Sequence, residues 1–229
     1  MWEVEVRQWL QLAGCTVSPN ESLSGLCGGP DFRCERHGKR FYVEATCIEV
    51  GTAEKRTGIP FRRMGASGVD IYGMTDAILK ECQGKAPQCA DLDAPCLLAI
   101  GTFHLIAATV GFKKVLLAQV LTGHVSMSWE IDLATGETID GVHNESSLRA
   151  AAFIKPDSGA VSFARLSISG LLFPQVGRSP RSGRGLLNPG AVRPFRPEWL
   201  PEVEFGKLEV DSAGGRLVVS WPPVASPES

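Results

Sequence analysis

Apolar residues at the start of the chain recur at helical spacing. The positions are Trp2, Val6, Trp9, Leu10 and Ala13. Residues three and four apart lie on the same face of a helix, and Gly14 stands where a helix commonly ends. The first segment therefore predicts one amphipathic helix.

Apolar and polar residues alternate after residue 30, as they do in strands. Strands are expected at 31–35 and 39–48, and Gly38 in the intervening "RHGK" suits a tight hairpin turn. Within "FYVEATCI" (41–48), Glu44 has apolar neighbours on both faces of the strand. Burying an unpaired carboxylate costs several kcal/mol, so we expect an Arg, a Lys or a metal ion beside Glu44.

The remaining patterns alternate between helix and strand. After residue 48 we expect a loop rich in Gly, Lys and Arg, then a helix at 75–85, a central strand at 96–101 and a helix at 113–121. Residues 125–139 predict a strand and a turn, and 160–173 predict one long strand. Residues 174–190, rich in Gly, Pro, Ser and Arg, predict an exposed loop, and the prolines after 191 predict an extended tail.

These patterns together predict an α/β fold, in which a mixed central sheet of about four or five strands is flanked by helices. A core at 1–175 is expected, with the Arg/Gly/Pro-rich loop and the extended C-terminal tail packing on it at 176–229.

The charge pattern argues against a generally polybasic protein. The formal net charge is −2 over 229 residues, but residues 31–63 contain eight Lys or Arg against five Asp or Glu. Residues 178–196 contain five Arg and no acid. A solvated loop is one interpretation of such segments. Phosphate contact is the other, and for DNA we expect it to involve some of Arg33, Arg36, Lys39 and Arg40.

The seven cysteines form no CxxC pair, which supports neither a disulfide scaffold nor a zinc ribbon. Reduced, mostly buried thiols in a cytoplasmic protein are expected instead. The N-terminus lacks the apolar region of a secretory signal, and the longest apolar stretch, 95–112, is interrupted by polar residues and Gly. No histidine has a partner at metal-ligand spacing.

Two acids occupy positions from which they can approach one cation. Asp31 begins the first strand of the hairpin and Glu44 lies on the second. Mg²⁺ prefers such oxygen ligands, and the main-chain carbonyl of Ala45 can add a third. The alternative is an isolated Asp31 and a Glu44 that is paired with Arg33, Arg40 or another base.

This arrangement resembles the PD-(D/E)xK nuclease superfamily, in which a Pro-Asp pair precedes an acid-x-Lys strand. Pro30 and Asp31 match the first part, and Glu44, Ala45 and Thr46 occupy the second. Thr46 departs from the pattern, because it stands where the family has a lysine that positions or activates the attacking water.

The resemblance supplies a substitute for that lysine. Some members carry the basic residue on the following helix, and "GKAPQC" is similar to their Lys-x-x-Gln stretch, which implies Lys85 as the substitute and Gln88 as its polar neighbour. Lys80 is the second choice. Glu3, in the first helix, matches an acid that the family carries there, although an acid in a first helical turn also suits the helix dipole.

What the resemblance implies is a restriction-endonuclease-like fold and hydrolysis of phosphodiester bonds in DNA. Asp31 and Glu44 would hold Mg²⁺ or Mn²⁺, with Lys85 beside the attacked phosphate. A catalytically silent binding module and a hydrolase of another substrate are the alternatives, since fold alone does not determine function.

Overall fold

The N-terminal segment and the hairpin form as the sequence predicts. Helix α1 spans Trp2–Leu12, and Gly14 follows it with φ +82°. Strands β2 (Phe32–Arg36) and β3 (Lys39–Cys47) are joined by His37 and Gly38, both of which have positive φ. Two such residues in succession are typical of the turn whose twist matches a β-hairpin.

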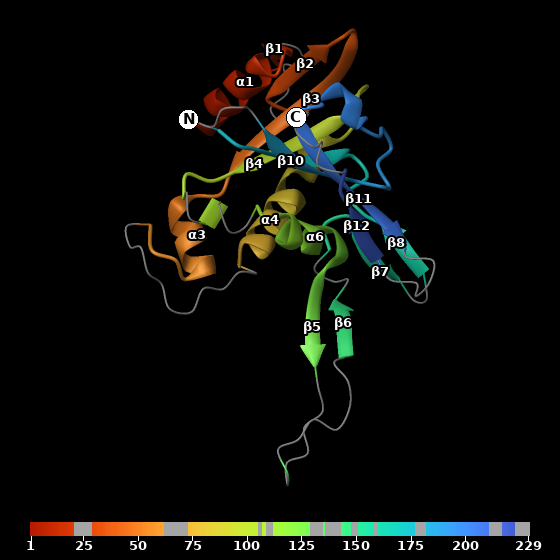
Figure 1. Cartoon of the computed structure of the whole chain (residues 1–229). Coiled ribbons are helices and arrows are strands. Elements are labelled where there is room, and N and C mark those ends of the chain that lie inside the picture. The colour runs from red at the N-terminus through yellow and green to blue at the C-terminus, as the bar shows by residue number, and fades with distance from the viewer. Residues whose placement is uncertain are drawn as a thin grey trace, which may run out of the picture.

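A mixed eight-stranded sheet runs through the centre of the molecule (Figure 1). This computed structural model describes residues 1–20, 29–61, 73–104, 107–108, 112–128, 135, 143–147, 151–157, 160–176, 182–210 and 217–222. The strand order is β1-β2-β3-β4-β9-β10-β11-β12. The remaining strands of this sheet are β1 (Thr16–Pro19), β4 (Cys96–Gly101), β9 (Gly170–Pro174), β10 (Gly183–Leu187), β11 (Val203–Val210) and β12 (Leu217–Ser220).

The α/β class is confirmed, and the predicted size of the sheet is wrong. Glycines explain part of the error, because "GRGLL" reads as a loop but forms the fully paired strand β10. A Cβ at Gly185 would lie 2.2 Å from the ring of Phe205, so glycine is needed there for close packing. Strands β11 and β12 come from the segment expected to be an extended tail.

Two further expectations need correction. The segment expected to be one long strand at 160–173 is divided into β8 (Ala160–Phe163) and β9, which belong to different sheets. The segment after residue 48, expected to be a loop, contains helix α3 (Val50–Thr57). Residues 62–72 of that expected loop lie outside the described part of the chain, as do residues 177–181 of the later one.

Helices cover the two faces of the sheet (Figure 1). Helix α1 packs on one face with Phe41, Val43, Leu97 and Ala99. On the other face lie α4 (Gly73–Lys85) and α6 (Lys114–Thr122), which bury Tyr42, Leu98 and Ile100. The 3-10 helix η1 (Ala86–Cys89) continues α4, and the 3-10 helix η3 (Pro197–Trp199) precedes β11.

Two small hairpins complete the described elements. Strands β5 (His124–Ser128) and β6 (His143–Ser147) pair in a two-stranded sheet that projects from the main body in Figure 1. Strand β7 (Ile154–Asp157) pairs with β8. Apart from residue 135, the predicted turn after β5 lies outside the described residues.

The cysteines are free, as expected, at all six positions that the structure describes, and five of them are buried. Among the described helices, none is long and apolar enough to span a bilayer.

The parallel pairing of β3 with β4 determines where the predicted site residues lie. Glu44 is in register with Leu98, and the crossover between the two strands contains α3 and α4. The crossover carries α4 over the face of the sheet from which Glu44 and Thr46 project. The C-terminal end of α4 therefore lies beside the middle of β3.

The contact between α1 and β4 leads to a stability prediction. Trp2 donates a hydrogen bond to the carbonyl of Ala99, and its ring fills the space where a Cβ on Gly101 would stand, 2.0 Å from the nearest ring atoms. We expect Gly101→Ala to lower the free energy of unfolding by about 1–3 kcal/mol in urea denaturation. Gly84→Ala is the control, because a Cβ on this α4 residue meets nothing within 4 Å. It should leave stability unchanged or raise it by up to about 1 kcal/mol. Equal effects of the two variants would contradict this account of the α1 contact.

Candidate functional site

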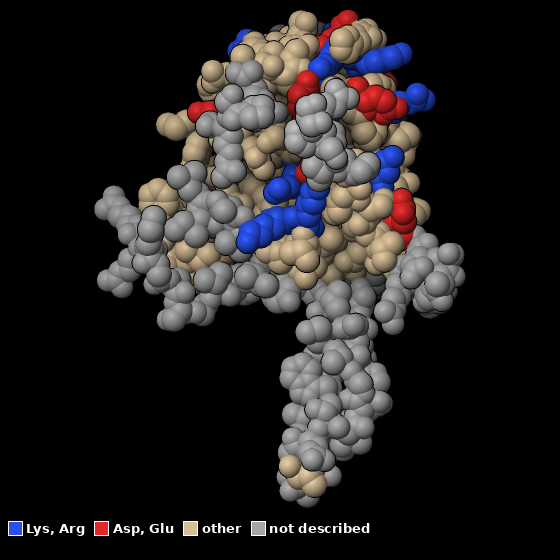
Figure 2. All heavy atoms as spheres, in the orientation of Figure 1, with Lys and Arg blue, Asp and Glu red and all other residues tan. Residues whose placement is uncertain are grey.

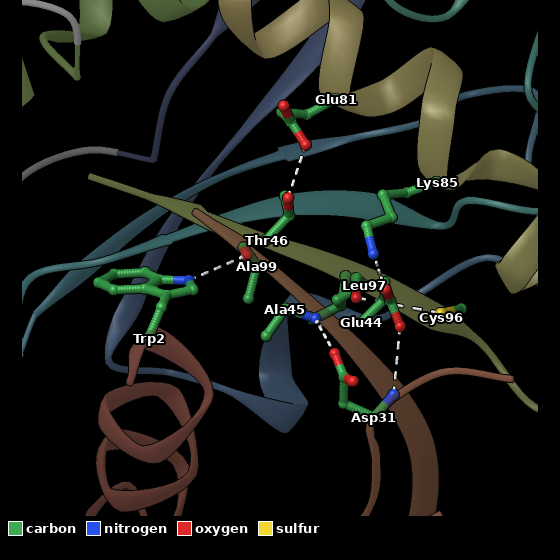
Figure 3. Close-up of polar contacts among 10 residues, drawn as sticks. All are labelled: Trp2, Asp31, Glu44, Ala45, Thr46, Glu81, Lys85, Cys96, Leu97 and Ala99. Carbon is green, nitrogen blue, oxygen red and sulfur yellow. Dashed lines mark hydrogen bonds and ion pairs between the residues drawn. The ribbon is translucent and has the colours of Figure 1, made fainter. Parts of the chain in front are cut away.

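Asp31 and Glu44 come together where β2 begins. The pairing of Phe32 with Val43 places Asp31 across from Glu44. The main-chain N–H of Asp31 donates to Glu44 Oε2 at 3.2 Å, and the N–H of Ala45 donates to Asp31 Oδ2 at 2.7 Å (Figure 3). Asp31 is thus held by the strand that carries Glu44.

Lys85 is the cation that the burial of Glu44 requires. Its Nζ lies 2.7 Å from Glu44 Oε1, and the Glu44 side chain is 3% exposed while that of Lys85 is 28% exposed. The alternative partner Arg40 forms an ion pair with Asp93 instead. The ion pair therefore joins a buried acid on β3 to a partly exposed base at the end of α4.

The pKa values of the two acids follow from this burial. Burial raises the pKa of Glu44 to about 7, since the hydrogen bond from Lys85 lowers it only partly and the neighbouring Asp31 carboxylate raises it further. The pKa of Asp31 is raised, first by burial, against the hydrogen bond from Ala45. For Lys85, burial lowers the pKa, but the hydrogen bond and charge of Glu44 outweigh it, so the net direction is upward. The site thus favours either a proton or a cation on its acids.

A second polar contact crosses the same interface. Thr46 Oγ1 donates to Glu81 Oε2 at 2.6 Å, next to the ion pair in Figure 3. The sequence reasoning did not select Glu81. The available signal was its spacing of four residues from Lys85, which places both side chains on one face of α4.

The other predicted site residues lie at different depths. Glu3 is exposed on α1, and its charge contributes to raising the pKa of Asp31, so its carboxylate lies near enough to act on the site. Gln88 lies in η1, and its Oε1 is buried without a hydrogen-bond partner among the described residues. Lys80, the second choice for the base, is exposed on α4, while the contact with Glu44 is made by Lys85.

The donor atoms at this site suit a hard cation. The N–H groups of Tyr42 and Ile48 bond carbonyls on the β4 side. Successive residues of a strand face opposite edges, so both the N–H and the C=O of Ala45 face Asp31. Two carboxylates and one carbonyl, completed by waters, fit what Mg²⁺ accepts. Within the described ranges, no group of three or more His, Cys, Asp or Glu residues gathers to hold a metal ion.

A separate cavity lies among η3, β11 and β12. Its volume is about 610 Å³, and its lining includes Trp221 and the acids Glu198, Glu204 and Glu209. None of its lining residues belongs to the Asp31 site. The wall contains these three carboxylates and one lysine, Lys207, a net negative lining that disfavours a phosphate ligand. We therefore take Asp31, Glu44 and Lys85 as the candidate site.

Comparison with known proteins does not identify the chain. No family model matches it, and no curated protein or solved structure matches it. The functional argument therefore depends on the geometry of the site.

The raised pKa of Glu44 predicts a pH-dependent effect of Glu44→Gln. The stability that protonated Glu44 contributes is fully present below its unfolded pKa of about 4.5 and is lost as pH rises through about 7. Measured with EDTA, the unfolding free energy of Glu44→Gln relative to the unsubstituted protein should rise by up to about 3 kcal/mol between those pH values, since one pKa unit corresponds to about 1.4 kcal/mol. Glu35→Gln, which alters an exposed carboxylate of the same hairpin, is the matched control. A difference that stays flat with pH would show that folding does not raise the pKa of Glu44.

Proposed function

We propose that this protein is a metal-dependent nuclease, of the PD-(D/E)xK type, that hydrolyses phosphodiester bonds in DNA. The observation that carries the proposal is the convergence of Asp31, which precedes β2, with Glu44 of β3 and Lys85 of α4. These three residues were selected from the sequence, where 13 and 41 residues separate Glu44 from the other two.

Each residue has a distinct role in this proposal. Asp31, Glu44 and the carbonyl of Ala45 would hold Mg²⁺ or Mn²⁺. When bound, such an ion polarises a phosphoryl oxygen and lowers the pKa of bound water. Lys85 places a positive charge beside the acids, and its exposed fraction lets it contact a phosphate oxygen. Glu3 and Gln88 would add polar contacts around these groups.

Basic side chains on the surface support a nucleic-acid partner. Lys and Arg gather near the centre of the face in Figure 2, in the region that α4 and α6 occupy in Figure 1. Among the four basic residues of the hairpin, Arg36 makes a two-fold contact with Glu202, at 2.6 and 2.8 Å, and its side chain is 12% exposed. Arg36 therefore stabilises the fold, and phosphate contacts are left to more exposed residues such as Lys39.

A silent binding module is the second candidate, and one observation favours it. Lys85 already compensates the charge of Glu44, so the buried acid needs no metal ion to be tolerated. The missing strand lysine at Thr46 agrees with this reading. DNA binding in EDTA without cleavage in any divalent cation would distinguish this module from the nuclease.

The nuclease proposal predicts Mg²⁺- or Mn²⁺-dependent cleavage. We expect Asp31→Asn and Glu44→Gln to abolish it, because each removes one of two carboxylate charges while keeping a similar shape. Lys85→Ala should slow cleavage about tenfold or more without preventing Mn²⁺ binding. Plasmid and labelled single- and double-stranded oligonucleotides serve as substrates, and calorimetry measures Mn²⁺ binding.

Lys80→Ala is the matched control, since it removes an exposed lysine from the same helix. Its cleavage rate should stay within about twofold of that of the unsubstituted protein. Equal losses in Lys80→Ala and Lys85→Ala would show that the helix contributes only general charge. Full activity of Lys85→Ala would show that Lys85 takes no part in the chemistry.

The position of Glu81 makes Thr46→Lys a suitable test of whether Lys85 replaces the strand lysine of the family. A lysine at residue 46 would face Glu81 and stand beside Glu44, so its charge would be partnered. We expect Thr46→Lys to raise cleavage in a Lys85→Ala background, because it restores a base near the acids. A rate equal to that of Lys85→Ala alone would contradict the substitution of one lysine for the other.

A further inference from the structure

The contact between Thr46 and Glu81 lies beside the ion pair of Glu44 and Lys85, in an interface whose remaining packing is apolar. Thr46 is 8% exposed, and the layer between β3 and α4 is filled by Ile78, Cys82, Leu98 and Ile100. An apolar residue at position 46 would avoid burying a hydroxyl there. The retained hydroxyl and its carboxylate partner need a reason beyond packing.

Spacing places this contact beside the ion pair. Glu44 and Thr46 are two residues apart on β3, so their side chains leave one face about 6–7 Å apart. Glu81 and Lys85 are four residues apart on α4 and emerge about 6 Å apart. The charge of Glu81 is among those that raise the pKa of Lys85, against the effect of burial. The four side chains form two adjacent bridges between strand and helix.

The hydrogen-bond capacity of Thr46 determines what the second bridge can do. A threonine hydroxyl has one proton and two lone pairs, and here the proton is donated to Glu81. Oγ1 can therefore only accept a further hydrogen bond. A water next to it must point a proton at Thr46 and its own lone pairs elsewhere.

We propose that Thr46 and Glu81 together take over the water-orienting part of the missing lysine's role. Thr46 contacts the attacking water, and Glu81 is a positioning residue that acts through Thr46 by fixing its hydroxyl. The inference rests on the proposed nuclease function. Hydrolysis of each phosphodiester bond uses one water. The water oxygen bonds to phosphorus, and the leaving sugar oxygen keeps the electron pair of the broken P–O bond. One proton ends on the new phosphate and the other on the leaving hydroxyl.

Glu81 acts through Thr46 and not as a third metal ligand. The described residues hold no group of three acids, histidines or cysteines close enough to share an ion, so Glu81 does not join Asp31 and Glu44 in one. Its observed partner is the hydroxyl of Thr46. Loss of Glu81 should therefore leave metal affinity unchanged.

The test compares Thr46→Val, which keeps the shape and removes the hydroxyl, with Thr46→Ser, which keeps the hydroxyl. We expect Thr46→Val to lower kcat roughly tenfold or more with KM within about twofold, and Thr46→Ser to restore kcat to within about threefold. Glu81→Ala should lower kcat as Thr46→Val does, and Glu81→Gln, which still accepts the threonine proton, less. DNA affinity in EDTA, measured by fluorescence anisotropy, and Mn²⁺ affinity, measured by calorimetry, should stay within about twofold.

Thr57→Val is the matched control, because Thr57 is a buried threonine whose hydroxyl bonds the carbonyl of Ala53 on α3. If Thr46→Val loses only thermal stability, as Thr57→Val is expected to, the hydroxyl is structural and the inference is overturned. If Thr46→Val is poorly folded, Thr46→Ser and Glu81→Gln decide, and full kcat in Glu81→Ala overturns the inference. If the unsubstituted protein cleaves DNA and the Thr46 and Glu81 variants have the same kcat, this inference alone is overturned. Absence of cleavage in every divalent cation overturns the proposed function as well.

Discussion

The ion pair between Glu44 and Lys85 is the constraint on which the site depends. Glu44 lies on a strand with neighbours on both edges, and the compensating charge comes from the helix that covers its face. Helix α4 must therefore end where Lys85 reaches the strand, and the turn through Pro87 begins directly after it. A buried ion pair is often no more stabilising than apolar residues of the same size. Its presence is therefore not in itself a sign of added stability.

Local patterns predicted the elements that carry this pair. The hairpin, the central strand and α4 follow from alternation, a glycine in the turn and helical spacing, all of which lie within a few residues of each other. The placement of Lys85 beside Glu44 came from a family resemblance, since 41 residues separate them and periodicity carries no such information. Glu81 was missed because its only local sign was a spacing shared by many helical residues.

The sequence patterns predicted too few strands for the sheet, and the reason is physical. Glycine and proline mark turns when the chain is exposed, but in β10 Gly185 is needed because it packs against the ring of Phe205. That ring comes from β11, in the segment expected to be an extended tail. A contact between two distant segments that each look irregular leaves no trace in either pattern. The sheet size was therefore accessible only from the structure.

The parallel pairing of β4 with β9 affects the order in which the sheet forms. The two strands are parallel neighbours, and the main-chain N–H of Cys96 bonds the hydroxyl of Ser169, 73 residues away. Such closure costs more loop entropy than the nearby pairing of β2 with β3, so it should form later and more slowly. The acids and the lysine all belong to the more local portion, from β2 to α4. Asp31, Glu44 and Lys85 can thus come together before strands β9 to β12 join the sheet and complete the apolar layer beneath α4 and α6.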